Sequence, residues 1–182
     1  MILLVPTHAT SGAWSIRPTF KVTSISTNGP PRSSLPPWGC RWGAAGLIVV
    51  ANTAHDSLLV CLVDNDKTLG FPKGRAERED TSALCTALRE WTEETGLLTT
   101  HLQIECEPLV HSGPHGEVHY FAGLWDEIVS PSAWRVHDDP HDNSPITHAF
   151  GLPLDEVFHL QRLPAYRHEL LRSALRRLHL LA

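Results

Sequence analysis

The hydrophobic residues of this chain gather in short apolar runs that are separated by polar, turn-rich intervals. Two neighbouring runs, Trp42 to Ala51 and Ser57 to Val63, have the length of buried strands, and the interval Asn52 to Asp56 between them is typical of a turn. Together they predict a hairpin of two buried strands. Further runs of strand length lie at residues 69–71, at 103–110 with an interruption near Pro108, at 118–125 and at 146–154.

A helical period appears first between about residues 81 and 95. Apolar side chains fall on one side of this predicted helix, at Leu84, Ala87, Leu88 and Trp91. Charged side chains fall on the other side, at Arg89, Glu90, Glu93 and Glu94. Asp80, Thr81 or Ser82 can cap the start of the helix, and Gly96 fits the position just past its end.

A second helix is predicted to begin at Pro164, where the missing N–H of proline costs nothing. Its apolar stripe comprises Leu163, Tyr166, Leu170, Leu171, Ala174, Leu175 and Leu178. Its basic residues are expected on the outer, solvated side, namely Arg167, Arg172, Arg176, Arg177 and His179. Strands on both sides of one helix, followed by a second helix, predict an α/β fold with a mixed sheet between helices.

The N-terminal part of the chain has a different composition from the rest. Residues 1–38 contain no Asp or Glu, and proline pairs stand at 30–31 and 36–37. We therefore predict an irregular arm or leader at 1–38 and one domain at 39–182. The composition of the arm partly fits an organelle transit peptide. We favour a flexible arm and expect a cytoplasmic protein.

Charge and cysteine usage narrow the functional classes. The net charge is −5, and the residues after 55 hold 20 acidic side chains against 11 lysines and arginines, which disfavours general nucleic-acid binding. No run approaches the ~18 apolar residues of a membrane span. The four cysteines lack a metal-ligand spacing and predict reduced thiols, with Cys85 packed beside the apolar side of the first helix. The four are Cys40, Cys61, Cys85 and Cys106.

The acidic side of the first helix is the strongest candidate for chemistry. Glu90, Glu93 and Glu94 lie in the last two turns, where the helix dipole disfavours negative charge. Carboxylates this close raise one another's pKa values unless a cation or a partner such as Arg89 lies among them. Mg²⁺ prefers such oxygen ligands, and Mn²⁺ is a second option. The alternative interpretation is a solvated, charged helix face.

The segment REWTEETGL, Arg89 to Leu97, resembles the second half of the Nudix box, R-E-U-x-E-E-x-G-U with U apolar. GFPKG at 70–74 resembles the loop that leads into the box. The box places its arginine fourteen residues after its first glycine, whereas Gly74 and Arg89 are fifteen apart. We expect the extra residue in the loop, because an insertion inside the helix would rotate the acidic side by about 100°. Four residues remain candidates for the first acid position of the box: Glu77, Glu79, Asp80 and Thr81.

This resemblance implies a Nudix-like α/β/α sandwich and a Mg²⁺-dependent pyrophosphohydrolase. The implied metal ligands are Glu90, Glu93, Glu94 and a backbone carbonyl near Gly74, and Arg89 is expected to orient the glutamates. The expected substrate-binding residues are Lys73, Gly74 and Arg75. The general base is one of the glutamates or a residue outside the box, for which Glu117 and Asp126 are weaker candidates.

The resemblance leaves several substrates open. We rank small polyphosphates first: nucleoside-diphosphate-linked compounds, dinucleoside polyphosphates and diphosphoinositol polyphosphates. Capped RNA, the substrate of decapping Nudix enzymes, ranks second, and a non-catalytic nucleotide-binding domain is the alternative of another class. The sequence predicts neither the oligomeric state nor the base preference.

Two groups of residues that contain histidines resemble metal sites in composition. His111, His115 and His119 recur every fourth residue, but Gly113, Pro114 and Gly116 exclude a helix there. We therefore interpret His111 and His115 as loop residues near the substrate and His119 as a strand residue. A second group is interpreted as a long surface loop: His137, Asp138, Asp139, His141 and Asp142.

Overall fold

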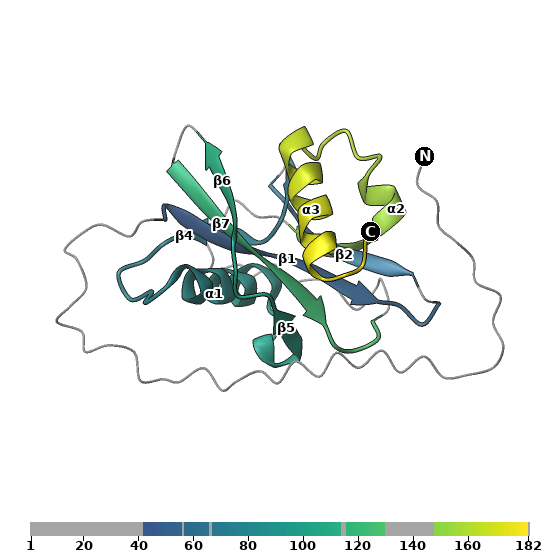
Figure 1. Cartoon of the computed structure of the whole chain (residues 1–182), viewed down its shortest axis with the longest axis horizontal. Helices are drawn as coiled ribbons and strands as arrows, with labels where there is room; N and C mark the ends of the chain where they lie inside the picture. The colour runs from purple at the N-terminus through teal and green to yellow at the C-terminus, as the bar shows by residue number, and fades with distance from the viewer. Residues whose placement is uncertain (1–41, 56, 66, 114–115, 130–147, 182) are drawn as a thin grey trace.

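The computed structural model describes residues 42–55, 57–65, 67–113, 116–129 and 148–181. The predicted arm at 1–38, His115 and the polar segment at 137–142 lie outside these residues. In the described part, a mixed sheet lies between α1 on one face and α2 with α3 on the other (Figure 1). The predicted α/β fold with a sheet between helices is confirmed.

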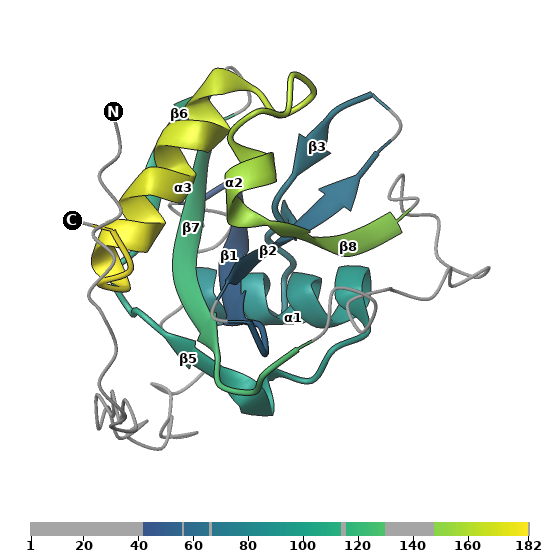
Figure 2. The same cartoon turned by 90° about the vertical axis from the view of Figure 1, so that its right-hand side faces the viewer.

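The sheet of the described residues has eight strands. They are β1 (Ala44–Asn52), β2 (Leu58–Asp64), β3 (Leu69–Gly70), β4 (Lys73–Arg75), β5 (Leu102–Ile104), β6 (Leu109–Gly113), β7 (Gly116–Trp125) and β8 (His148–Pro153). The central path runs β3-β2-β1-β7-β5, with β4 on β1, β6 on β7 and β8 on β2. The pairing of β1 with β7 is parallel, and the other pairings are antiparallel. Figure 2 shows β8 and β3 towards one edge and β5 towards the other.

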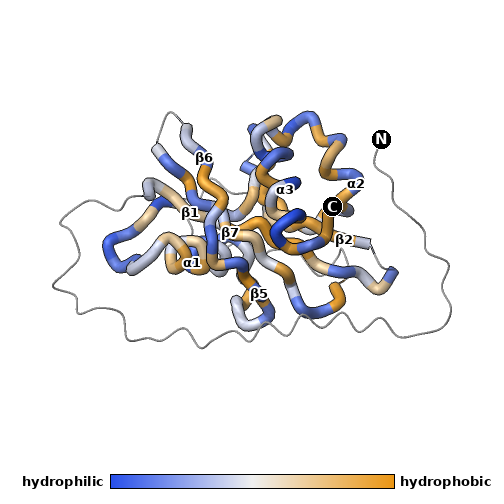
Figure 3. The backbone as a smooth tube through the Cα atoms, in the orientation of Figure 1, coloured by the Kyte–Doolittle hydropathy of each residue, from blue (hydrophilic) through white to orange (hydrophobic). Residues whose placement is uncertain are grey.

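The predicted hairpin of buried strands is confirmed as β1 and β2. Their side chains alternate between two apolar clusters, one on each face of the sheet. Ile48 and Val50 face the cluster beneath α3, whereas Leu47 and Val49 face the cluster above α1. Because both faces are covered, β1 is apolar along almost its whole length and does not alternate with polar residues (Figure 3).

Two strand predictions were wrong in detail. The segment GFPKG at 70–74 was expected to belong to the loop that leads into the box, but residues 73–75 form β4 on the edge of β1. The run at 103–110 is not one interrupted strand, because β5 ends at Ile104 and β6 begins only at Leu109. His111 therefore lies in a strand and not in a loop. Both errors concern strands of three to five residues, which show no clear periodicity in the sequence.

The remaining elements are helical. They are α1 (Ala83–Thr95), the short 3₁₀ helix η2 (Thr99–His101), α2 (Leu154–Val157) and α3 (Ala165–Arg177). In α3 the predicted apolar stripe is largely confirmed, since Leu171, Ala174 and Leu175 are fully buried. No helix in the described residues is long and apolar enough to cross a membrane.

Arg167 of α3 is buried, which corrects its predicted place on the solvated side. The residue is 9% exposed, and its Nη1 donates a hydrogen bond to the carbonyl oxygen of Leu69 in β3. A second arginine makes a similar contact with β2: Arg162 binds both carboxylate oxygens of Asp64 at 2.9 and 2.6 Å. These arginines attach the C-terminal part of the chain to the strands that precede β4.

Gly46 of β1 allows the chain after β3 to pass close to the centre of the sheet. A Cβ atom at this position would lie 2.3 Å from the carbonyl oxygen of Pro72 and 2.4 Å from Cβ of Lys73. We therefore expect Gly46→Ala to lower the free energy of unfolding by about 1–3 kcal/mol, because β4 has to move away from β1. Urea unfolding followed by circular dichroism measures this loss.

Gly123→Ala provides the matched control. The nearest atom to a Cβ there is a side-chain methyl carbon of Val49 at 3.3 Å, which has more freedom to move than a backbone carbonyl. We expect this substitution to change the free energy of unfolding by less than about 1 kcal/mol. Equal losses for the two variants would contradict a specific close approach at Gly46.

Candidate functional site

Helix α1 carries the charged side predicted from the sequence, and both its ends are capped. The hydroxyl of Ser82 accepts a hydrogen bond from the N–H of Cys85 at 3.1 Å, so Ser82 is the cap among the three candidates. Gly96 ends the helix with φ 64°, a conformation that suits glycine. Ala87 and Trp91 are fully buried against the sheet, and this packing directs Arg89, Glu90 and Glu93 towards the loop that follows β4.

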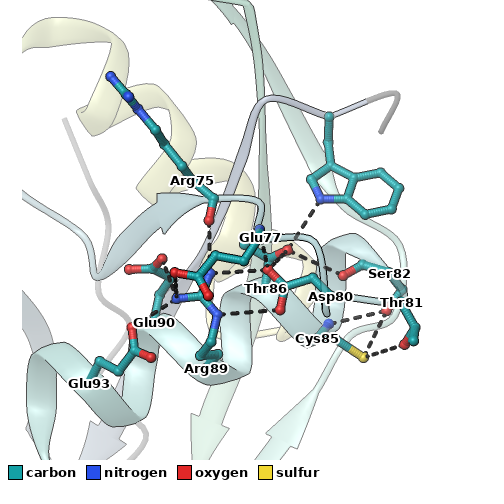
Figure 4. Close-up of polar contacts among 11 residues, drawn as sticks. Arg75, Glu77, Asp80, Thr81, Ser82, Cys85, Thr86, Arg89, Glu90 and Glu93 are labelled. Atoms are coloured by element: carbon teal, nitrogen blue, oxygen red, sulfur yellow. Dashed lines mark hydrogen bonds and ion pairs between the residues drawn. The ribbon is translucent and has the colours of Figure 1, made fainter. Parts of the chain in front are cut away.

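The guanidinium group of Arg89 is the centre of the charged cluster (Figure 4). Nη1 lies 2.8 Å from a carboxylate oxygen of Glu90 and 2.8 Å from one of Glu93. Nη2 lies 3.0 Å from Asp80 and donates a hydrogen bond of 2.8 Å to the carbonyl oxygen of Arg75. Glu77 lies farther from Nη1, at 3.6 Å. One arginine thus joins carboxylates of the helix to carboxylates of the preceding loop.

Asp80 is the loop acid most tightly held in this cluster. Its side chain is only 6% exposed, and it accepts hydrogen bonds from Arg89, from the hydroxyl of Thr86 at 2.9 Å and from the N–H of Glu77 at 2.8 Å. Burial alone would raise the pKa of Asp80, but these hydrogen bonds outweigh it and hold the pKa below its usual value. Thr81, by contrast, contacts the thiol of Cys85. Of these two candidates for the first acid position, the structure thus brings Asp80 and not Thr81 into contact with Arg89.

Glu90 lies directly against the backbone of Gly74. A Cβ atom on Gly74 would come within 2.0–2.1 Å of the carboxyl atoms of Glu90, so only glycine fits between β4 and the helix. Burial raises the pKa of Glu90, although the charge of Arg89 acts in the opposite direction. Gly74, which the sequence predicted as part of the site, therefore brings the backbone of β4 into contact with Glu90, a candidate metal ligand.

Glu94 contacts the first residue of β4, Lys73. Its Oε2 accepts a hydrogen bond of 2.9 Å from the N–H of Lys73. Burial raises the pKa of Glu94 to about 8, and the nearby charge of Glu90 adds to this effect. In the metal-free protein, Glu94 is thus protonated over much of the neutral range.

Lys73 and Arg75, the two predicted phosphate contacts, both belong to β4. Figure 4 shows the side chain of Arg75 pointing away from the cluster around Arg89, although its carbonyl oxygen belongs to that cluster. Strand β4 therefore contributes backbone groups to the acidic site and cationic side chains beside it. The assigned roles of all these residues remain predictions.

The donor set fits a hydrated divalent cation better than a complete protein cage. Within the described ranges, no three His, Cys, Asp or Glu side chains form a ready-made metal cage. Glu90 and Glu93 both contact Arg89, and Glu94 bonds to a backbone N–H. Mg²⁺ typically keeps several waters and takes only one or two protein carboxylates.

The weaker candidates for a general base lie at opposite ends of β7. Glu117 stands at the end near β4 and pairs with His119 at 3.5 Å. Asp126 follows the far end of the strand and lies 3.4 Å from His101. A strand rises about 3.3 Å per residue, so Asp126 is roughly 20 Å or more from the acidic site, which argues against it.

The contacts of Thr86 and Cys85 were not foreseen. Thr86 is fully buried, donates to Asp80 and accepts a hydrogen bond of 3.2 Å from Nε1 of Trp42. Its position three residues before Arg89 on the helix is the only sequence signal for this role. Cys85 is partly exposed, and its Sγ lies 3.2 Å from the hydroxyl oxygens of Thr81 and Ser82. Its side chain therefore contacts polar groups at the start of α1.

The raised pKa of Glu94 gives the metal-free protein a specific pH dependence. Between about pH 4.5 and 8, unfolded Glu94 loses its proton while folded Glu94 keeps it, so the folded state binds more protons and stability falls as the pH rises. Glu94→Gln keeps an oxygen for the N–H of Lys73 but does not titrate. We expect the variant to gain stability relative to wild type across this window, by roughly 1.4 kcal/mol per unit of pKa shift, with no further gain above pH 8.

The measurement is urea unfolding at several pH values in the presence of EDTA. Glu79→Gln, in the exposed segment before α1, is the matched control and should follow the wild-type curve. A constant difference between Glu94→Gln and wild type from pH 5 to 8 would show that burial does not perturb this carboxyl group.

Comparisons with known proteins agree with this geometry. A model of the NUDIX domain matches residues 41–173. Among solved structures, the NUDIX domain of Shewanella oneidensis NrtR complexed with ADP ribose has a TM-score of 0.56 and 17% identity, and the match covers 80% of this chain and 94% of that one. A C. elegans Ap4A hydrolase binary complex has a TM-score of 0.55 and 17% identity, with 75% and 95% covered. A mutT/nudix family protein from Listeria innocua has a TM-score of 0.53 and 18% identity, with 75% and 92% covered.

At these identities the solved structures show a common fold. A search of curated proteins finds no match. The family model spans β1 to most of α3 and includes α1 with its carboxylate cluster. The chain therefore belongs to the Nudix family and is a hydrolase that acts on phosphoric anhydride bonds.

Proposed function

We propose that this protein is a Mg²⁺-dependent pyrophosphohydrolase of small polyphosphates, with residues 39–182 as its catalytic domain. The observation that carries the proposal is the gathering of Glu90 and Glu93 around Arg89, with the backbone of Gly74 in contact with Glu90. A solvated helix face needs neither the close contact of Glu90 with the backbone of Gly74 nor a guanidinium group shared by two glutamates and the buried carboxylate of Asp80.

In this proposal Glu90, Glu93 and Glu94 hold the cation together with a backbone carbonyl near Gly74, and Mn²⁺ substitutes for Mg²⁺. The cation supplies charge neutralisation of the diphosphate and lowers the pKa of a bound water. Arg89 fixes the direction of two of the carboxylates through its short ion pairs. The N–H of Lys73 fixes the third, Glu94.

The side chains of Lys73 and Arg75 are proposed to bind phosphate oxygens. Phosphoryl transfer demands mainly positioned charge, because charge accumulates on the oxygens around the reacting phosphorus. Both cations come from the strand whose backbone contacts the glutamates. Substrate and carboxylates are thus positioned by one short segment.

The proposed substrates carry a nucleoside diphosphate or a longer polyphosphate. One structure of the same fold is an Ap4A hydrolase and another is complexed with ADP ribose, which supports a nucleotide substrate here. Dinucleoside polyphosphates and nucleoside-diphosphate-linked compounds therefore come first, and diphosphoinositol polyphosphates complete the class. The acidic balance of the chain after residue 55 places capped RNA behind them.

Phosphate release from a panel of these compounds with Mg²⁺ tests the proposal. We expect turnover of at least one small polyphosphate, and a loss of at least about a hundredfold in kcat for Glu93→Gln and Glu90→Gln. Glu79→Gln, which changes an exposed glutamate ahead of the helix, serves as the control. Wild-type activity in Glu93→Gln and Glu90→Gln would refute the metal site, and turnover of capped RNA alone would reverse the order of substrates.

A substitution at Gly74 tests the contact between β4 and the helix. Gly74→Ala places a methyl group where the carboxyl of Glu90 lies, so Glu90 must move. We expect the affinity for Mg²⁺ or Mn²⁺, measured by calorimetry, to fall roughly 10- to 100-fold. Gly113→Ala is the matched control, because a Cβ there meets nothing closer than 3.9 Å. Equal affinities for the two variants would contradict a metal site at this contact.

A further inference from the structure

A row of four side chains crosses the sheet on the face opposite to α1. Strand pairing places Arg75 of β4 beside Ala44, Ala44 beside Val118, and Val118 beside His111 of β6. Directly paired residues point to the same face of a sheet. Val118 packs with the cluster beneath α3, so the whole row faces the α3 side.

The next row of paired residues also faces the α3 side of the sheet. It pairs Lys73 with Gly46, Gly46 with Tyr120, and Tyr120 with Leu109. Gly46 has no side chain, and Cβ of Lys73 lies 2.4 Å from where its Cβ would be, so Lys73 leaves β4 on this face too. The two cations proposed to bind phosphate therefore lie at one end of both rows, beside small residues of β1.

An aromatic pair stands at the other end. The ring of His111 stacks on the ring of Tyr166, with centroids 4.2 Å apart and planes inclined by 7°. Tyr166 is the second residue of α3, so the pair lies where the helix begins and not beneath its middle. Both residues are partly exposed, and so are Ala44 and Val118 between them and Arg75. The guanidinium group of Arg167 lies over the ring of Tyr166, 5.4 Å from its centroid. The face that the pair offers for stacking is therefore the outer face of His111, with Tyr166 behind it.

The separation of the two ends suits a nucleotide. Three strand spacings lie between β4 and β6, which amounts to about 14 Å. A phosphate chain held at β4 has to extend through a ribose before a planar base reaches β6. Cations at one end, small residues between and aromatic rings at the other end match the charge and shape of such a molecule.

We propose that His111 and Tyr166 form the stacking site for the base of a nucleotide substrate. This inference rests on the proposed function, since it takes the phosphates to lie at β4. It makes His111 and Tyr166 determinants of specificity and selects, within the proposed class, substrates that carry a planar base over inositol polyphosphates. Stacking accepts any base, so the pair discriminates ring-bearing from ring-free ligands rather than adenine from guanine.

The experiment compares AMP with ribose 5-phosphate, which is the same molecule without the base. Binding of each to the full chain is measured by NMR titration in EDTA, where no hydrolysis occurs. We expect wild type to bind AMP about tenfold more tightly than ribose 5-phosphate, in the range reported for base–aromatic stacking. Tyr166→Leu and His111→Leu should bring the ratio close to one, whereas Tyr166→Phe and His111→Phe should preserve it.

Leu98→Ala, at an exposed residue after α1, is the remote control and should keep the wild-type ratio. Circular dichroism and thermal melting establish that each variant is folded, and the phenylalanine variants retain the test if a leucine variant is not. A wild-type ratio of one, or an unchanged ratio in both leucine variants, would overturn the inference. A tenfold ratio in a protein that hydrolyses no panel member would refute the proposed function and leave the stacking site in place.

Discussion

The shared guanidinium group of Arg89 is the interaction on which the acidic site depends. Glu90 and Glu93 lie about one turn apart on α1, and without a cation between them their charges repel. Arg89 places that cation within 2.8 Å of both, and it also reaches Asp80 and the carbonyl oxygen of Arg75. The several carboxylates that Arg89 binds explain why the helix tolerates acids where its dipole opposes them.

Strand β4 links this cluster to the opposite face of the sheet. Its backbone meets Glu94 through the N–H of Lys73 and Glu90 through Gly74, while the side chains of Lys73 and Arg75 point to the α3 side. Three residues thus connect the carboxylates with the proposed phosphate and base contacts. The buried Arg167 supports the same segment, because it bonds to Leu69 just ahead of it. Helix α3 therefore contributes to the site although it carries none of the carboxylates.

The sequence predicted the parts of this site that lie on one long element. Arg89, Glu90 and Glu93 follow from helical spacing, and the apolar side with Trp91 fixes the direction in which they point. Strand β4 escaped prediction because three residues with no apolar alternation look like a loop. The choice between Asp80 and Thr81 could not be made by counting, since it depends on which side chain folds back to Arg89. Arg167 was misplaced because a helical pattern treats every arginine as a surface residue.

The parallel pairing of β1 with β7 has a consequence for how the protein folds. It joins Ala44 to Val118, and the whole carboxylate helix lies in the stretch of chain between them. The hairpin of β1 and β2 forms from local contacts, but this central pairing closes a long loop and pays its entropy before it gains contacts. The helix can therefore form early, whereas the two faces of the site come into register only when this long-range pairing of β1 with β7 is made.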